Sequence, residues 1–161
     1  DNSGTVTIRN IHVAGWPADG MYMSHAGANP DSQGGAVQIE NAYLKNNNIE
    51  NVRLGGLGSY CRNCVIHVEG RSAVSSNQSS QKNPRGLWFK EQSGNKCVDC
   101  DIKVQGADAV FASDEGSGTL IDSRVDGSIR GPVDEQNVSG NPDLTPPRDV
   151  PMSAKEAASG C

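Results

Sequence analysis

The chain has 161 residues, 35% of them hydrophobic and 20% charged, a size and balance suited to one globular domain with a tail. Its formal net charge is −5 and it contains no basic block, which argues against nucleic acid as a partner. No apolar run approaches the length of a membrane-spanning helix, so we expect no membrane span. The 19 glycines, with Asn, Asp and Ser between short apolar runs, favour strands and turns over long helices.

The predicted strands come from a short pattern that occurs five times along the chain. Each copy has an apolar residue, any residue, an Asn or Asp that we call the marker, two further residues and a second apolar residue. The markers are Asn10, Asn41, Asn63, Asp99 and Asp122. A second short run with alternating apolar residues follows them, at 20–23, 51–54, 86–89 and 109–112, with a weak fifth one at 127–129. One copy is about 22 residues long, and polar loops at 24–35 and 71–84 lengthen the first and third.

A unit of this length cannot bury its own apolar face, so its copies must stack to make a core. The repeat resembles the right-handed parallel β-helix, the pectate-lyase-like architecture of polysaccharide lyases, pectin-type hydrolases, tailspikes and many surface proteins. The resemblance covers about residues 4–131 and implies an all-β solenoid of about five coils. At each bend, the marker side chain would bond the marker one coil away. Five hairpins in a sandwich are the alternative, although only Asp19-Gly20 and Asp126-Gly127 give a two-residue hairpin signal.

The repeat is expected to stop after Gly131, which divides the chain into a β-helix domain over 1–131 and an extended linker or capping tail over 132–161. Segment 141–151 holds four of the eight prolines and cannot continue a strand ladder. We expect the tail to lie across the last coil, because the open end of a solenoid exposes unpaired backbone groups. Nothing visible covers the first coil, so we expect an upstream segment, a second protomer or a larger parent assembly there.

Two copies carry a pair of cysteines around the marker. Stacking places Cys61 in one column with Cys97, and Cys64 in another with Cys100, roughly 4.8 Å apart if the strands are parallel. A disulfide tolerates that separation, so we predict two bridges that each join coil three to coil four. A zinc site with four thiolate ligands and four reduced thiols in the core are the alternatives. The remaining cysteine, Cys161, either pairs with another chain or stays a free thiol.

An outward-facing stripe runs along the second strand of successive coils. Its members, Tyr22, Arg53, Trp88 and Phe111, alternate with apolar residues that face inward. Aromatic rings stack on the C–H faces of sugars, and a guanidinium binds hydroxyl or carboxylate groups. We therefore predict that the stripe binds glycan or a protein partner. Packing of these rings under the two polar loops, or against another protomer, is the alternative.

Charged residues just past the stripe give an enzymatic alternative. His25, Lys90, Glu91 and Asp114 are weak candidates for catalytic groups, because stacking would line them along one edge. A polysaccharide lyase needs a base and a cation that neutralises the uronate, and a hydrolase needs acidic groups at a defined separation. The paired-Asp motif and the Arg-Ile-Lys tripeptide of pectin-type hydrolases are both missing. No metal is assigned, and calcium enters only under the lyase alternative.

Asn77 and Asn137 are the acceptor residues of two glycosylation sequons. Together with the predicted disulfides they favour an extracellular location, or the surface of a cell or virion. The sequence therefore predicts a β-helical structural or adhesin-type surface protein that binds glycan or a protein partner through the stripe. A fragment of a polysaccharide lyase or glycoside hydrolase acting on acidic polysaccharide is the alternative, and the non-enzymatic function is favoured over it.

Overall fold

The computed structural model describes residues 5–16, 20–23, 35–47, 50–69, 85–90, 92–113 and 116–152, which form eleven strands and no helix. The strands are β1 (Val6–Ala14), β2 (Met21–Met23), β3 (Val37–Lys45), β4 (Glu50–Leu54), β5 (Tyr60–Val68), β6 (Arg85–Phe89), β7 (Gln92–Val98), β8 (Asp101–Ala112), β9 (Gly116–Ile121), β10 (Arg124–Arg130) and β11 (Val133–Gln136). This part of the chain is all-β, as predicted. In the same ranges, no helix is long and apolar enough to cross a membrane.

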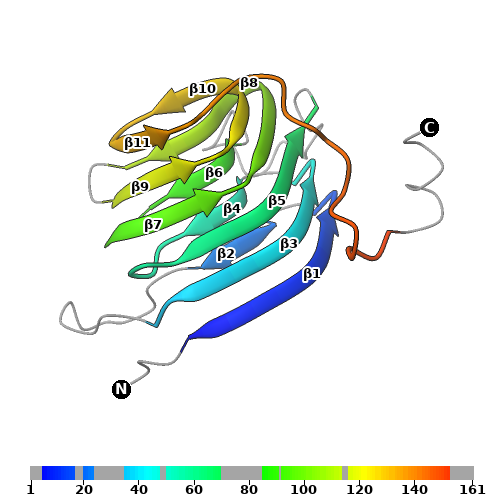
Figure 1. Ribbon diagram of the computed structural model, residues 1–161, viewed down its shortest axis with the longest axis horizontal. Coiled ribbons are helices and arrows are strands. Elements are labelled where there is room, and N and C mark those ends of the chain that lie inside the picture. The colour runs from blue at the N-terminus through cyan, green and yellow to red at the C-terminus, as the bar shows by residue number, and fades with distance from the viewer. Residues whose placement is uncertain are drawn as a thin grey trace, which may run out of the picture.

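The strands join into three ladders, and every pairing in them is parallel (Figure 1). The first ladder contains the N-terminal parts of β1, β3 and β5, followed by β7, β9 and β11. The second contains the C-terminal parts of β1, β3 and β5, followed by the first residues of β8 and β10. The third contains β2, β4, β6 and the last residues of β8 and β10. Each of the five predicted copies therefore contributes backbone to all three ladders.

Each marker lies where the chain turns from the first ladder into the second. The five predicted markers have φ between 49° and 55°, a left-handed conformation that Asn and Asp adopt more readily than most residues. Asn41 donates from Nδ2 to Asn10 Oδ1 at 3.0 Å, and Asn63 donates in the same way to Asn41 at 2.9 Å. A sixth residue of this kind is Asn137, with φ of 54° and a 2.7 Å bond to Asp122 Oδ1. The predicted marker-to-marker bonding is present at these positions.

The parallel pairing continues past Gly131, where the sequence predicts its end. Strand β11 pairs with β9 over four residues, and an isolated parallel bridge then joins Ser139 to Arg124. A sixth, incomplete layer therefore covers the fifth copy. After Val133, which packs against the core, its strand carries acidic and amide side chains and so lacks the apolar alternation that marks the other copies. The division of the chain into two domains stays a prediction, but the ladder itself extends to Gln136.

One apolar cluster contains the inward-facing residues of all three ladders. Its largest fully buried side chains include Phe89, Leu54, Ile66 and Ile102. Burial of a side chain of this size contributes about 1.5–3 kcal/mol to stability. Gly118 lies directly under the ring of Phe89, and a Cβ atom at this position would collide with that ring.

The tail packs on the outer face of the second ladder. Residues 141–152, which we call the strap, run back past the ends of β5 and β3 (Figure 1). A small apolar cluster outside the sheet joins the strap to these strands, and it consists of Tyr43, Val65, Leu144, Val150 and Met152. The backbone N–H of Asp143 donates to Asp101 Oδ1 at 2.8 Å. The part of the tail that lies on the last coil is therefore 133–139, and the strap instead covers the apolar outer surface of β3 and β5.

Candidate functional site

The stripe is one continuous column in the third ladder. Register pairs Tyr22 with Arg53, Arg53 with Trp88, and Trp88 with Phe111. Five of the neighbours that alternate with the stripe are fully buried on the other face, and they are Val52, Leu54, Leu87, Phe89 and Val110. The column then continues to Arg130, which pairs with Phe111. The sequence pattern missed Arg130 because the fifth copy has too few apolar residues around it.

Guanidinium groups alternate with aromatic rings along the stripe. Arg53 Cζ lies 4.4 Å from the ring centre of Tyr22 and 4.1 Å from that of Trp88. The ring centres of Trp88 and Phe111 are 5.8 Å apart, a normal aromatic contact. A guanidinium over an aromatic face within about 6 Å is stabilised by the ring quadrupole, by about 0.5–1 kcal/mol at exposed sites. Arg53 is therefore held in one orientation by the two rings that flank it.

Two further arginines border the stripe. Arg85 Cζ lies 4.7 Å from the Trp88 ring centre and 4.1 Å from that of Phe111, and Arg130 Cζ lies 5.5 Å from the latter. Asp108 Oδ2 is 4.0 Å from Arg85 Nε and 3.6 Å from Arg130 Nη1. The half-buried carboxylate of Asp108 thus anchors both guanidinium groups at one end of the column.

Exposure differs along the stripe. Tyr22 is 47% exposed to solvent, whereas Arg53, Trp88 and Phe111 are half-buried. The indole Nε1 of Trp88 is buried, and within the described part of the chain it has no hydrogen-bond partner. Of the aromatic rings in the stripe, that of Tyr22 is therefore the best placed for direct contact with a ligand.

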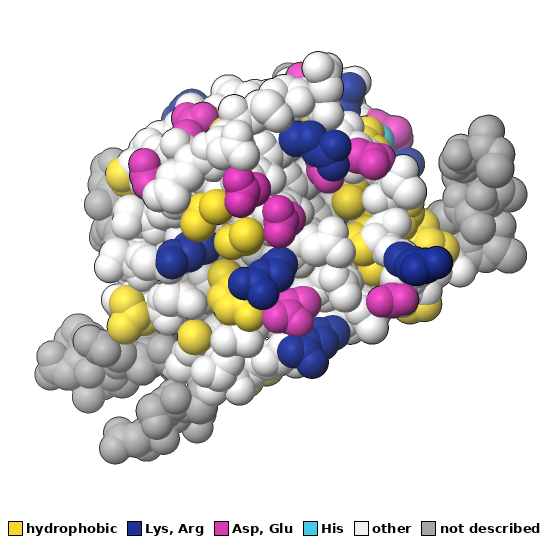
Figure 2. Space-filling model, in the orientation of Figure 1, with side chains coloured by type: hydrophobic (Ala, Val, Ile, Leu, Met, Phe, Trp, Pro, Cys, Tyr) yellow, Lys and Arg dark blue, Asp and Glu magenta, His cyan; other side chains and the backbone are white. Residues whose placement is uncertain are grey.

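The outer face of the first ladder carries a different arrangement. Arg9 Nε contacts Glu40 Oε2 at 2.6 Å, and the Tyr60 hydroxyl donates to Glu40 Oε1 at 3.0 Å. The hydrogen bond from Arg9, and then that from Tyr60, hold the pKa of Glu40 below its ordinary value. Figure 2 shows this face with basic, acidic and apolar side chains mixed and with no large area of one sign. The Glu40 carboxylate is thus already bound by Arg9 and Tyr60, which makes this face a weaker candidate than the stripe.

Of the four candidate catalytic residues, the described ranges include only Lys90. Its backbone N–H donates to Leu54 O at 2.9 Å, and its carbonyl accepts a hydrogen bond from the Ser113 hydroxyl. His25, Glu91 and Asp114 lie outside the described residues, as do Asn77 and Cys161. Among the residues that are described, no group of three or more His, Cys, Asp or Glu side chains is placed to hold a metal ion.

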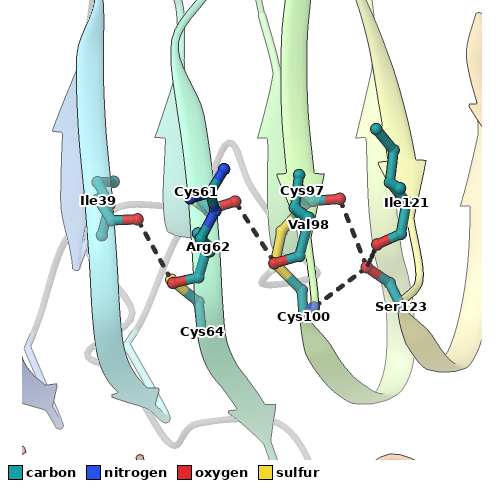
Figure 3. Close-up of a disulfide and its surroundings, with 9 residues drawn as sticks. All are labelled: Ile39, Cys61, Arg62, Cys64, Cys97, Val98, Cys100, Ile121 and Ser123. Atoms are coloured by element: carbon teal, nitrogen blue, oxygen red, sulfur yellow. Dashed lines mark hydrogen bonds between the residues drawn. A yellow bond between two sulfur atoms is a disulfide. The ribbon is translucent and has the colours of Figure 1, made fainter. Parts of the chain in front are cut away.

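The four cysteines that flank the markers of the third and fourth copies lie in the core at the bends of those copies (Figure 3). Cys61 pairs in register with Cys97, so the predicted columns are present. The disulfide, however, joins Cys97 to Cys100 within one copy, with Cα atoms 6.0 Å apart, while Cys61 and Cys64 are free and buried. The predicted bridges between copies are wrong in this structure. The left-handed marker turns the chain so that the cysteines on both sides of it face the core, and the nearest partner is then in the same copy.

A cavity of about 550 Å³ lies between the strap and the C-terminal ends of β1, β3 and β5. Tyr43, Leu144 and Met152 form its apolar part, and Lys45 and His67 are among its polar groups. His67 is only 6% exposed, although on β5 it alternates with Ile66 and Val68, which are buried in the core. The missed signal is the apolar outward position of Tyr43 and Val65, which predicts that something covers this face.

Burial sets the protonation of His67. Desolvation lowers its pKa below the ordinary value of 6.5, although the nearby charge of Glu69 works in the opposite direction. His67 Nε2 is 3.4 Å from Glu69 Oε1, and Lys45 Nζ is 3.4 Å from the other carboxylate oxygen. The neutral imidazole is therefore the form that the folded chain favours.

No protein-family model matches the chain, and comparisons with curated proteins and with solved structures give no significant match either.

Proposed function

We propose that the chain folds as a right-handed parallel β-helix, in which the three ladders are the three faces of one solenoid. The support is that successive copies enter the same ladders in the same order, with their markers aligned at one bend. A right-handed path is the form that connections between parallel strands adopt in nearly all proteins.

We propose further that the protein is a structural or adhesin-type surface component that binds glycan through the stripe. The observation that carries this proposal is the in-register column of Tyr22, Arg53, Trp88 and Phe111, with its guanidinium held between two rings. A sugar needs an apolar ring face for its C–H groups and fixed donors for its hydroxyl or carboxylate groups. The stripe offers both at neighbouring positions.

The ordering of the Arg53 side chain before a ligand arrives would favour binding at the stripe. An arginine side chain that is free in solution loses rotamer entropy when it binds, at about 0.5–1.5 kcal/mol for such a side chain. Arg53 has already been ordered by the rings of Tyr22 and Trp88. In this proposal, the sugar ring stacks on the exposed ring of Tyr22, and the half-buried Trp88 and Phe111 serve as the base that holds Arg53.

We propose an extracellular location, or one on the surface of a cell or virion. The Cys97–Cys100 disulfide supports it, because disulfides persist in oxidising compartments. The sequon at Asn137 gives weaker support in the structure than in the sequence alone, because the side-chain amide nitrogen of Asn137 already donates a hydrogen bond to Asp122.

Tyr22→Ala is the substitution that tests the glycan proposal most cleanly. We expect it to weaken binding to the best ligand of a panel of neutral and acidic polysaccharides about tenfold, because it removes one stacking contact. The melting temperature should change little, since the ring is the most exposed of the stripe. Binding is measured by isothermal titration calorimetry on the purified full chain.

Trp16→Ala is the matched control, because Trp16 is 57% exposed and lies outside the stripe. It should leave binding unchanged. Equal losses for both variants, or no binding to any glycan, would exclude the proposal, and release of unsaturated sugar ends would favour the polysaccharide-lyase alternative. Trp88→Ala is a poorer test, because Trp88 also packs against Phe111 and Arg53 and its loss would lower stability as well.

A further inference from the structure

The two cysteine pairs occupy the same backbone corner in adjacent copies. Each pair flanks its marker, and the markers Asn63 and Asp99 both have φ of 51°. Register aligns the two corners directly, since Cys61 pairs with Cys97 and the residues after each cysteine also pair. The backbone that allows the Cys97–Cys100 disulfide is therefore repeated at the reduced pair (Figure 3).

The two free thiols are buried at the corner that matches the Cys97–Cys100 disulfide. Cys61 and Cys64 are 0% and 1% exposed. The neighbouring Cys64 thiol, and then burial, raise the pKa of Cys61, and the Cys61 thiol lowers the pKa of Cys64. The Cys64 sulfur also lies 3.3 Å from the carbonyl oxygen of Arg62. Cys64 is thus the thiol of the pair that loses its proton more readily.

We propose that Cys61 and Cys64 form a second disulfide of the same kind, so that the oxidised chain carries two disulfides, each within one copy and neither between copies. The oxidant is a small-molecule disulfide such as oxidised glutathione. During refolding, before the corner is buried, the Cys64 thiolate attacks one of its sulfur atoms and releases a thiolate, which takes up a proton. Cys61 then loses its proton, attacks the Cys64 sulfur and releases the second thiol. Two protons and two electrons leave the protein, and the oxidant becomes two thiols.

The fifth copy shows which substitutions this corner accepts. Ser123 occupies the position of Cys64 and Cys100, where its hydroxyl donates to Ile121 O at 2.8 Å and accepts from Cys100 N at 3.1 Å. Leu120 pairs in register with Cys97, so the other position accepts an apolar residue. Serine at positions 64 and 100, and alanine at positions 61 and 97, are therefore conservative replacements.

The experiment compares two double variants with the parent chain, all carrying Cys161→Ser. Cys97→Ala/Cys100→Ser keeps the pair of the third copy, whereas Cys61→Ala/Cys97→Ala keeps Cys64 and Cys100, which lie in different copies. Each chain is refolded in buffers with graded ratios of reduced to oxidised glutathione and is then quenched in acid. Alkylation followed by peptide mass mapping identifies the linked cysteines.

In the parent chain we expect two disulfides, each within one copy. In Cys97→Ala/Cys100→Ser we expect the Cys61–Cys64 disulfide. The ratio of reduced to oxidised glutathione at which half of this disulfide has formed should be within about tenfold of the ratio for the same disulfide in the parent. The Cys64/Cys100 chain should retain two thiols or carry glutathione. Peptides that join Cys61 to Cys97 or Cys64 to Cys100 in the parent would overturn the proposal. So would thiols at Cys61 and Cys64 that stay reduced under buffers in which Cys97–Cys100 is fully oxidised, or a stoichiometric zinc ion held by them. The peptide mass map of the parent chain shows which cysteines are linked even if a variant does not fold.

Discussion

At the scale of single residues, the markers act through one directional hydrogen bond. The amide Nδ2 of a later copy donates to the side-chain oxygen of the copy before it, as Asn41 does to Asn10 and Asn63 does to Asn41. A carboxylate accepts such a bond but has no hydrogen to donate. Asp99 therefore cannot extend the series to Asn63, and its carboxylate is followed in the same column by that of Asp122.

Asp99→Asn should complete this interrupted series. The new Nδ2 can donate to Asn63, one of two adjacent carboxylates is removed, and the left-handed φ of 51° suits Asn. We expect the free energy of unfolding to rise by about 0.5–1 kcal/mol, measured by urea denaturation. Asp149→Asn, which removes a charge from the strap, is the control and should leave the stability near that of the parent chain. A decrease for Asp99→Asn would show that this column is not bonded as described.

Gly118 tests the packing of the core in the same way. A methyl group at this position would collide with the ring of Phe89, which is fully buried in the core. Gly118→Ala should therefore lower the free energy of unfolding by about 1–3 kcal/mol. Gly140→Ala is the matched control, since no atom lies within 4 Å of a Cβ atom built there. Equal stabilities of the two variants would place the Phe89 ring elsewhere.

The sequence predicts some of these residue-level features and not others. The marker column and the stripe follow from spacing, because a two-residue alternation fixes which side chains share a face. Cysteine pairing does not follow from it, since the partner in the next copy and the partner three residues away are both within disulfide reach. Asn137 escapes the pattern because Glu135 stands where the other copies have an apolar residue.

At the scale of elements, the strap converts one face of the second ladder from a surface into a second interior. Tyr43 and Val65 are buried by it, so β3 and β5 have apolar cover on both faces. The proline-rich composition of the strap predicts an extended segment but does not indicate which part of the fold the segment packs against. Its position is decided by the apolar outward residues of β3 and β5, which belong to strands far from it in sequence.

The pH dependence of stability reports on the burial of the outer face of β3 and β5 by the strap. Burial under the strap lowers the pKa of His67 below 6.5, so the folded chain binds fewer protons there than the unfolded chain does. The stabilisation that depends on neutral His67 is complete above pH 6.5 and is lost as the pH falls from there through the lowered pKa. We expect the free energy of unfolding of the parent chain to fall between about pH 7 and pH 5.

His67→Gln should flatten this part of the profile, because glutamine does not titrate. Carboxyl groups whose pKa values are lowered, such as that of Glu40, also lose stability on acidification, and they are common to both chains. The difference between the parent and His67→Gln therefore reports the histidine together with its interaction with Glu69, whose carboxylate lies 3.4 Å from His67 Nε2. Chemical denaturation at a series of pH values gives the comparison. Parallel profiles for the two chains would mean that the folded state does not favour the neutral imidazole.

At the scale of the whole molecule, stability depends on the position of a copy in the stack. The middle copies pack against neighbours on both sides, and their inward residues are fully buried. In the first copy, Ile8, Ile11 and Val13 are only partly buried, and Val6 is 57% exposed. Within the described residues, β1 pairs with β3 alone. A stack of this kind opens from its least covered end, since each layer is held by its immediate neighbours.

Native-state hydrogen exchange measures this gradient directly. We expect the amides of β1 and β2 to exchange through local opening, at rates at least about 100-fold above those of β5 and β8, because an end layer detaches without breaking the rest of the stack. The amides of β5 and β8 should exchange only with global unfolding. Exchange is followed by mass spectrometry of peptides from the full chain at two protein concentrations. Equal protection of β1 and β5 would contradict an open first layer. If that protection then fell on dilution, a second copy of the chain would be the cover, because its contribution depends on concentration.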